Sequence, residues 1–305
     1  MKKKKTKIHL LVIGGTGFIG HNILKKAKML NWNLSSASRR KPKKSKIIKG
    51  VHYMKVDITN KSQIKKRLNQ NFTHVINAAG NASENFKENN KKKIFQLYHL
   101  GPKNLIDFFL KKKIQNFIQI GSSAEYGPLK APQSENNKCY PKSDYGIAKL
   151  KTTEHISKLY DKKKFPSTVI RLFQVYGHEQ DHQSILQFII KNCLKNKSFD
   201  LSKGNQTRDF CFIDDVIRAI FLLIKSKKKG EIFNVAQGVS ISIKKLTNMI
   251  KNKLKKGKPN FGKIKYKKNE IIHSRANIKK INKKIKWKPK IKIDEGINLL
   301  LNYEQ

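Results

Sequence analysis

The stretch Ile8–Gly20, IHLLVIGGTGFIG, contains a short apolar run that is followed directly by three spaced glycines. Leu10–Ile13 has the length of one buried strand, and from Phe18 onward apolar residues recur at helical spacing. A strand, a glycine turn and a helix in this order place backbone N–H groups at a helix N-terminus, where they can bind a pyrophosphate. The stretch therefore predicts a dinucleotide-binding turn.

The three glycines of this turn have different predicted tasks. Gly14 permits the tight turn, Gly17 lets the backbone approach phosphate, and Gly20 lets the helix pack closely on the strand. The spacing is GxxGxxG rather than GxGxxG, and glycines also occur in strand-to-helix turns that only pack. The candidate cofactor contacts of the turn are Gly14, Gly17, Phe18, Ile19 and Gly20.

The composition is that of a globular chain with an extreme positive charge. Its 305 residues, 38% of them hydrophobic, are enough for two lobes and a large core. The formal net charge of +48 comes from 61 lysines and seven arginines against 20 acidic residues. The lysines fall in short scattered runs, whereas nucleic-acid-binding proteins also use arginine and interleaved aromatic residues. We interpret the excess as solvated lysine faces and keep a nucleic-acid-binding Rossmann protein as an alternative of a different class.

Cysteine usage and hydropathy favour a cytoplasmic protein. Cys139, Cys193 and Cys211 show no metal-ligand spacing, which is typical of a reducing compartment. The basic start and first apolar run imitate a signal peptide, but His9 interrupts the run and the glycine turn explains it better. No later stretch approaches the roughly 20 apolar residues of a membrane span. The motif HEQDH at His178–His182 follows YG in a predicted loop without a third ligand, so we predict no metal site.

Alternating apolar runs and helical patterns predict a doubly wound α/β fold around a parallel sheet. After the first strand, the expected elements are a second strand ending within 34–40, a third at Val51–Ile58, a fourth at Val75–Gly80, a helix near Phe95–Phe109 and a fifth strand at Phe117–Ile120. We expect a dinucleotide-binding domain over residues 1–172, to which about 209–237 returns, and a smaller substrate-binding lobe over 173–305.

The end of the second predicted strand distinguishes NAD from NADP. An acidic residue there would hold the ribose 2′-hydroxyl of NAD, but the chain has Ser38, Arg39 and Arg40. No carboxylate repels a 2′-phosphate, and guanidinium groups could pair with it, so we predict NADP, with NAD as the alternative. Further candidate cofactor contacts follow the next strands: Asp57, Ile58, Ala78 and Ala79.

Tyr145 and Lys149 are four residues apart on a predicted helix and share one face, and Ser123 stands 22 residues before Tyr145 at the end of the fifth predicted strand. In sequence order, GGTGFIG, Asp57, NAAG, SSAEYG, YGIAK, RLFQVYG, RDFCFIDDV and WKPKIKIDEGI resemble the extended short-chain dehydrogenase/reductases of the NAD-dependent epimerase/dehydratase type. These ordered matches are more specific than YxxxK alone. The resemblance implies a Rossmann-type sheet, a C-terminal lobe, a nucleoside-diphosphate sugar in the cleft between the lobes, and a homodimer.

The resemblance also implies roles for individual residues. Tyr145 would be the acid/base, Lys149 would hold the nicotinamide ribose and favour the phenolate of Tyr145, and Ser123 would bind the reacting substrate oxygen. A tyrosine with its ordinary pKa of about 10 is a poor base at neutral pH without such help. Arg208 and Arg275 resemble the family's ligands for the substrate diphosphate, because a planar guanidinium suits that anion.

The chain departs from the family pattern near the predicted site. Tyr98 stands where the family has an Asn, which puts a proton relay through that position in doubt, and Gln174 replaces an Asn near the sugar. Ala124 takes the position of an Asp found in some dehydratases, while Glu125 keeps a carboxylate beside it. Glu125 is thus a candidate substrate contact or base, although we favour a residue that hydrogen-bonds a loop.

We predict NADPH-dependent reduction of a nucleoside-diphosphate keto-deoxysugar with Tyr145 as the acid, because exchangeable NADPH suits a net reduction. A 4-epimerase with a retained cofactor is the next alternative, and a 4,6-dehydratase that depends on Glu125 is the third. The intact set of Ser123, Tyr145 and Lys149 argues for catalysis over nucleic-acid binding.

Overall fold

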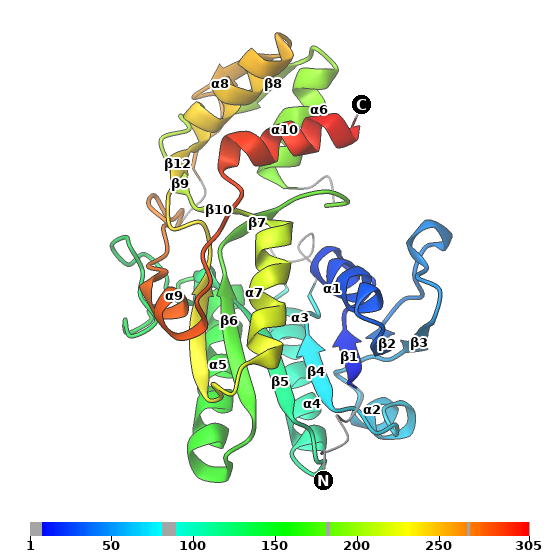
Figure 1. Cartoon of the computed structure of the whole chain (residues 1–305). Coiled ribbons are helices and arrows are strands. Elements are labelled where there is room, and N and C mark those ends of the chain that lie inside the picture. Colours follow the sequence, from blue (N-terminus) through cyan, green and yellow to red (C-terminus); the bar gives the residue numbers. More distant parts are fainter. Residues whose placement is uncertain (1–7, 81–89, 181–183, 267–268, 305) are drawn as a thin grey trace. The chain divides into compact units, whose positions relative to one another are not determined.

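A computed structural model of the chain describes residues 8–80, 90–180, 184–266 and 269–304. The chain divides into two compact units. Figure 1 shows the chain coloured from its N-terminus to its C-terminus. The first unit comprises Met1–Gly121, Ile147–Ile170 and Ile220–Ile232; the second comprises Ser122–Gly146, Arg171–Ala219 and Phe233–Gln305. The sequence predicts a domain boundary near residue 172, and the chain passes from the first unit to the second after Ile170. The segment Ser122–Gly146, which precedes this boundary, belongs to the second unit.

The first unit is organised around a seven-stranded parallel sheet, in the order β11-β6-β5-β4-β1-β2-β3 (Figure 1). The strands are β1 (His9–Ile13), β2 (Asn33–Ser38), β3 (Val51–Lys55), β4 (His74–Asn77), β5 (Asn116–Ser122), β6 (Ser167–Leu172) and β11 (Glu231–Val235). Pairing proceeds outward from β1 in both directions, and ligands of such sheets bind at this switch point, beyond the carboxyl ends of the strands. The predicted parallel α/β fold is confirmed; the third strand ends at Lys55, two residues before Asp57.

Helices connect the strands. They are α1 (Phe18–Met29), α2 (Lys61–Arg67), α3 (Lys91–Phe95), α4 (Gly101–Phe109), α5 (Asp144–Lys163) and α7 (Ile213–Lys225). Between α3 and α4 the chain makes one π-helical turn at Gln96–Leu100, where the sequence predicts a single regular helix. Such wide turns are rare and are found frequently at functional sites.

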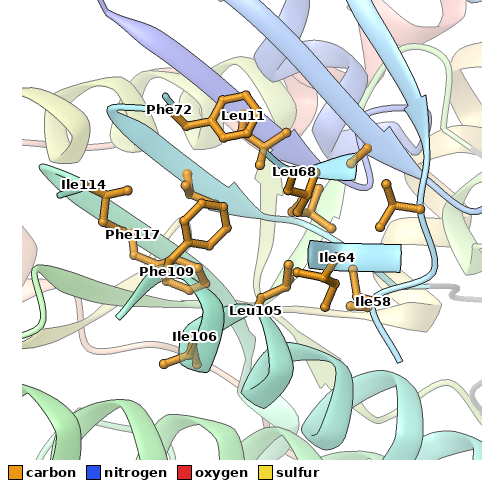
Figure 2. Packing of buried hydrophobic residues seen from close by; sticks show 14 of the residues in the cluster. Leu11, Ile58, Ile64, Leu68, Phe72, Leu105, Ile106, Phe109, Ile114 and Phe117 are labelled. Carbon is orange, nitrogen blue, oxygen red and sulfur yellow. The ribbon is translucent and has the colours of Figure 1, made fainter. Parts of the chain in front are cut away.

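The core of the first unit lies between the sheet and its helices. Figure 2 shows side chains of β1, α2, α4 and β5 converging, among them Leu11, Ile64 and Phe117. The ring centroids of Phe109 and Phe117 are 6.4 Å apart. Burying each such side chain contributes roughly 1.5–3 kcal/mol relative to leaving it exposed. This packing fixes β1, β4 and β5, whose carboxyl ends carry many of the predicted site residues.

The second unit contains short strand pairs and helices. Within the described residues the pairs are β7 (Gln174–Tyr176) with β10 (Phe210–Phe212), β9 (Thr207–Arg208) with β12 (Ile241–Ser242), and β8 (Ser198–Leu201) with β13 (Lys258–Phe261). Its further helices are α6 (Ile185–Leu194), α8 (Ile243–Leu254), α9 (Lys279–Ile285) and α10 (Ile293–Glu304). In the part of the chain that the structure describes, no helix combines the length and apolar character needed to cross a bilayer.

Candidate functional site

The glycine turn between β1 and α1 has a backbone geometry that only glycine satisfies. Gly14 has a φ of 78°, and its N–H donates to the carbonyl oxygen of Ala37 at 2.8 Å. A Cβ on Gly14 would lie 2.7 Å from the carbonyl oxygen of Ala78, and a Cβ on Gly20 would lie 2.2 Å from that of Gly14. Neither position therefore accepts a side chain, and the chain closes tightly around the turn.

Helix α1 begins after Gly17, which has no side chain to cap the helix N-terminus. Its N-cap residue, Gly17, is exposed and extended, and no acidic residue lies in the first helical turn. A Cβ on Gly17 would meet only the Gly14 carbonyl oxygen, at 3.4 Å, so packing does not demand this glycine. The first N–H groups of α1, from Phe18 and Ile19 onward, thus form a partly positive helix end. This end fits the pyrophosphate of a dinucleotide.

The predicted ribose contacts lie at the end of β2. Ser38 is buried, and its Oγ accepts from the N–H of Thr16 at 3.4 Å, so it borders the glycine turn. Arg39 and Arg40 follow directly and are exposed. This segment carries two cations and no carboxylate, as required to accept a 2′-phosphate.

The further candidate cofactor contacts have structural partners of their own. Asp57 Oδ1 accepts from the N–H and hydroxyl of Thr59, at 2.9 and 2.8 Å. Ile58 packs beneath Gly101, where a Cβ would lie 2.7 Å from its side chain. Beyond β4, Ala78 borders Gly14, and the N–H of Ala79 donates to Asn77 Oδ1 at 3.2 Å. Asp57 and Ala79 thus lie in hydrogen-bonded turns that follow β3 and β4.

Helix α5 carries Tyr145 and Lys149 one turn apart. Tyr145 is half-buried in the first turn, whereas the side chain of Lys149 is buried. Lys149 Nζ donates to the carbonyl oxygen of Ile120 in β5 at 2.8 Å and lies 5.1 Å from the centroid of the Tyr98 ring. This lysine is therefore anchored on the sheet of the first unit.

The start of α5 also packs on the segment that follows β5 in the second unit. A Cβ on Gly146 would lie 2.4 Å from the carbonyl oxygen of Ala124, and the N–H of Gly146 donates to Ser143 Oγ at 3.1 Å. Only glycine allows this approach. The backbone beside Tyr145 is thereby held against the backbone beside Ser123.

Two consecutive serines lie at the carboxyl end of β5. Ser122 is the last residue of the strand, and Ser123 begins a 3₁₀ turn over Ser123–Glu125. Ser122 Oγ accepts from the N–H of Ala124 at 3.2 Å, and the N–H of Ser122 donates to Glu125 Oε1 at 2.8 Å. The sequence pattern does not separate the last strand residue from the first turn residue, so it missed Ser122 as a second candidate hydroxyl.

Glu125 lies in a buried ion pair. Its Oε2 accepts from Arg171 Nε at 2.8 Å, and the Arg171 guanidinium lies 4.6 Å from the centroid of the Tyr126 ring. Burial raises the pKa of Tyr126 to about 12, although Arg171 opposes this shift. Burial also acts to lower the pKa of Arg171, but Glu125, Tyr126 and Cys139 together more than offset it, so the net shift is upward. These contacts join the turn Ser123–Glu125 to β5 and β6.

The two predicted diphosphate ligands lie on neighbouring backbone segments of the second unit. The N–H of Thr207, beside Arg208, donates to the carbonyl oxygen of Ile272 at 2.8 Å, and the N–H of Ser274, beside Arg275, donates to that of Thr207 at 3.2 Å. The two segments therefore run side by side.

Asp209, which sequence reasoning missed, fastens these segments. Its buried carboxylate accepts from the backbone N–H groups of Gln237, Gly238 and Ala276, at 2.8, 3.0 and 3.0 Å. Burial raises the pKa of Asp209 to about 6, although the three N–H groups act to lower it. The exposed Gln174 donates its N–H to the carbonyl oxygen of Asp209 at 3.0 Å. The RDF motif thus supplies both a candidate ligand and the residue that holds its surroundings.

The guanidinium of Arg208 already has an anionic partner. It forms an ion pair with Glu270, and its Nη1 donates to the carbonyl oxygens of Thr207 and Ile271, at 2.8 and 2.6 Å. Burial lowers the pKa of Arg208, and Glu270 opposes this effect. A diphosphate that binds this guanidinium would have to compete with the Glu270 carboxylate.

Only part of the HEQDH motif, His178–His182, lies within the described residues. His182 lies outside the described residues, and the ring of His178 packs against Phe212 and Tyr303 at centroid distances of 5.3 and 4.8 Å. Among the residues that are described, no group of three or more His, Cys, Asp and Glu side chains could hold a metal ion.

The sequence matches the NAD dependent epimerase/dehydratase family over residues 10–236. A Methanocaldococcus jannaschii protein provisionally named UDP-glucose 4-epimerase is 29% identical over 96% of this chain and 97% of its own. The dTDP-4-dehydro-6-deoxyglucose reductase of Escherichia coli is 25% identical over 96% of each chain.

A similar solved structure is the UDP-glucose 4-epimerase of Thermotoga maritima with UDP-glucose. It superimposes with a TM-score of 0.92 over 97% of this chain and 98% of its own, at 23% identity, which shows a shared fold. The family match covers well over half of the chain and includes the glycine turn, both serines, Tyr145 and Lys149. The chain therefore belongs to the NAD dependent epimerase/dehydratase family, as an enzyme of the extended short-chain dehydrogenase type.

Proposed function

We propose that the chain is an NADPH-dependent reductase of a nucleoside-diphosphate keto-deoxysugar. The observation that carries this proposal is the packing of α5 on the end of β5, where the carbonyl oxygen of Ala124 leaves no room for a side chain at Gly146. This contact brings the backbone at Tyr145 next to two serines. The similarity to a reductase of dTDP-4-dehydro-6-deoxyglucose supports the substrate class.

The proposed chemistry is proton donation to a carbonyl oxygen. Tyr145 gives its phenolic proton to the sugar oxygen as the adjacent carbon is reduced, and Lys149, one turn later, stabilises the phenolate that remains. Ser123, the predicted hydroxyl, or its neighbour Ser122 donates a hydrogen bond to the same oxygen and fixes its direction. When bound, the nicotinamide supplies the hydride.

The cofactor assignment is supported by the glycine turn and the end of β2. The tight approach at Gly14 and Gly20 leaves the uncapped start of α1 for a pyrophosphate. Ser38 and the exposed Arg39 would hold a 2′-phosphate, with Asp57, Ile58, Ala78 and Ala79 bordering the rest of the nucleotide. These contacts favour NADP, and NAD remains the alternative.

For the substrate, we infer a nucleoside-diphosphate sugar. Arg208 and Arg275 would bind its diphosphate, because a guanidinium matches phosphate oxygens in charge and shape. Gln174 is exposed and would contact the sugar. Glu125 was also predicted near the substrate, but its buried ion pair favours a structural role.

The proposal extends to the organisation of the protein. Residues 1–172 with about 209–237 would bind the dinucleotide, and the rest of 173–305 would bind the sugar nucleotide. The family resemblance further implies a homodimer, and the cysteine usage favours a cytoplasmic protein. Size-exclusion chromatography with light scattering tests the dimer, since a single species of about 35 kDa, the mass of one chain, would contradict it.

A 4-epimerase is the second candidate, favoured by the relative and the solved structure that carry that name. It would use the same Tyr145, first as a base and then as an acid, and would retain its cofactor. Under this reaction the NADPH supplied in solution would not be consumed.

One assay separates the two reactions. Purified protein is supplied with NADPH and dTDP-4-keto-6-deoxyglucose, and in parallel with UDP-glucose alone. Loss of NADPH absorbance supports the reductase, while formation of UDP-galactose without added cofactor supports the epimerase. Tyr145→Phe should abolish either turnover and leave RNA retention on a filter unchanged. Ser122→Ala and Ser123→Ala form a matched pair that identifies the reacting hydroxyl.

A further inference from the structure

Lys149 is buried between a backbone carbonyl of β5 and an aromatic ring. Its side chain is 5% exposed, and its Nζ donates to the carbonyl oxygen of Ile120 at 2.8 Å. The ring of Tyr98 lies beneath it, with the centroid 5.1 Å from Nζ. An ammonium that leaves water needs such partners, since an uncompensated buried charge is costly. The face of an aromatic ring attracts a cation most strongly when both are desolvated.

The ring of Tyr98 is held firmly in this position. Tyr98 is 3% exposed and lies within the π-helical turn Gln96–Leu100. Its carbonyl oxygen accepts from Thr152 Oγ1 at 2.7 Å, so α5 binds the backbone of Tyr98 as well as contacting its ring. A Cβ on Gly80 would lie 3.3 Å from the ring, which shows how closely the end of the NAAG motif approaches it.

We infer that Tyr98 is a positioning residue for Lys149: its ring holds the ammonium charged and aimed along α5 toward the turn that carries Tyr145. This inference rests on the proposed function, since it assigns Lys149 the task of favouring the Tyr145 phenolate. The π-helical turn supplies the wider backbone that points this ring at the lysine.

If this is so, the catalytic efficiency of Tyr98 variants should depend on the π electrons of the ring rather than on its size. Tyr98→Leu should lower kcat/KM for the reduction about tenfold, because the ammonium loses a desolvated cation–π contact. The alkaline limb of the pH–rate profile should move to higher pH, since a weaker cation nearby makes the phenol harder to ionise. Tyr98→Phe keeps the ring and should stay within about threefold of the wild type.

A fluorinated ring separates electronic character from folding. Tyr98→3,4,5-trifluorophenylalanine has nearly the shape of Tyr98→Phe but a weakened negative face, so it should reproduce most of the leucine effect. Phe108→Leu is the matched control, because Lys112 lies 5.6 Å from the Phe108 ring centroid at a site with no proposed catalytic role. This control should leave the pH profile unchanged.

Binding provides a readout apart from turnover. Calorimetry should show that Tyr98→Leu weakens NADP⁺ about threefold to tenfold, because Lys149 would hold the nicotinamide ribose. The same variant should bind 2′,5′-ADP, which lacks that ribose, as the wild type does. If wild-type protein binds NADP⁺ and turns over, but the phenylalanine and trifluorophenylalanine variants have the same pH profile and affinity, the inference is wrong. If wild-type protein binds no nicotinamide nucleotide, the proposed function itself fails.

Discussion

Glu125 and Arg171 form an ion pair at 2.8 Å in which their side chains are 0% and 3% exposed. Glu125 also accepts the N–H of Ser122, so a single carboxylate joins the end of β5 to a residue of β6. A buried charge that loses its partner is strongly disfavoured. The pair therefore holds Ser122–Glu125 in one conformation and, with it, the two serine hydroxyls.

Removing the carboxylate should destabilise the protein more than it impairs proton transfer. Glu125→Ala leaves the Arg171 guanidinium buried without its anion, and we expect the free energy of unfolding to fall by about 3–5 kcal/mol. Urea unfolding followed by circular dichroism measures this loss. The double variant Glu125→Ala/Arg171→Met should recover part of it, because no charge is then left unpaired.

Glu125→Gln tests the competing role of this residue in chemistry. The amide keeps an acceptor for the N–H of Ser122 but loses the charge. If turnover disappears while stability stays at the wild-type value, the carboxylate takes part in the reaction, as the 4,6-dehydratase alternative requires. Reduced stability with retained activity per folded molecule is the outcome expected here.

Two glycines of the nucleotide turn should respond differently to alanine. Gly17→Ala meets only ordinary contact, so its stability cost should be about 1 kcal/mol or less, whereas NADPH affinity should fall at least tenfold because a methyl group occupies the phosphate approach. Gly14→Ala should unfold far more readily, since φ is 78° and its Cβ would lie 2.7 Å from Ala78. Calorimetric titration with NADPH and thermal melting separate the effects. Undiminished NADPH binding by Gly17→Ala would place the phosphate elsewhere.

Much of the first unit could be predicted from the sequence because its signals are local. The apolar run before Gly14 and the helical spacing after Phe18 lie within a few residues of one another, and β1 and α1 follow them closely. The sequence also led us to expect a helix around Tyr145 and Lys149, where α5 lies. Tyr145 and Lys149 could therefore be placed one turn apart without knowledge of their neighbours.

The contacts that the sequence could not predict join distant segments. Glu125 meets a partner 46 residues away, and Arg208 pairs with Glu270 across 62 residues. No periodic pattern encodes such pairs. Asp209 was overlooked because a carboxylate next to a candidate ligand looks like a surface residue until its three backbone donors are known. The choice between Ser122 and Ser123 depends on where β5 ends, which hydropathy leaves undecided by one residue.

Arg39 should set the preference between the two cofactors. It is exposed at the end of β2, in a stretch whose sequence has no acidic residue, so Arg39→Ala should lower kcat/KM for NADPH about tenfold and leave that for NADH nearly unchanged. Steady-state rates with both cofactors measure the ratio, and added salt should narrow the difference. Arg40→Ala is the matched control. Equal losses with NADPH and NADH in the Arg39 variant would argue against a 2′-phosphate contact.

Two buried groups should give the folded protein opposing responses to acid. Burial lowers the pKa of His74 to about 4, so between pH 4 and 6.5 the unfolded chain binds a proton that the folded chain does not, and stability rises with pH. Asp209, whose pKa is raised to about 6, binds its proton in the folded state between pH 3.8 and 6, so its contribution falls as pH rises.

In the variant His74→Asn, the fall in stability with rising pH that Asp209 causes should therefore no longer be opposed by His74. Between pH 4 and 6, the free energy of unfolding of the variant should rise by about 2 kcal/mol less than that of the wild type, since each pKa unit corresponds to about 1.4 kcal/mol. Urea unfolding at several pH values measures the slope, and Asp209→Asn should change it in the opposite direction. Parallel slopes in the wild type and the His74 variant would show that His74 titrates alike in both states.

The Arg208–Glu270 pair should compete with the substrate. The side chains of Arg208 and Glu270 are 14% and 20% exposed to solvent, so a diphosphate can reach the guanidinium and exchange with the carboxylate. Glu270→Gln weakens this internal competitor, and we expect UDP or dTDP to bind about fivefold more tightly, the equivalent of an ion pair worth about 1 kcal/mol. Arg208→Lys should lose affinity, because an ammonium cannot match the diphosphate with a planar fork.

Calorimetry with free nucleoside diphosphates tests this without any turnover. Asp294→Asn is the matched control, since Asp294 pairs with Lys253 at 2.8 Å and has no proposed contact with substrate. Its affinity should equal that of the wild type. Weaker binding by Glu270→Gln would mean that Glu270 orients the guanidinium for the diphosphate instead of occupying its place, because the loss of a competitor can only strengthen binding.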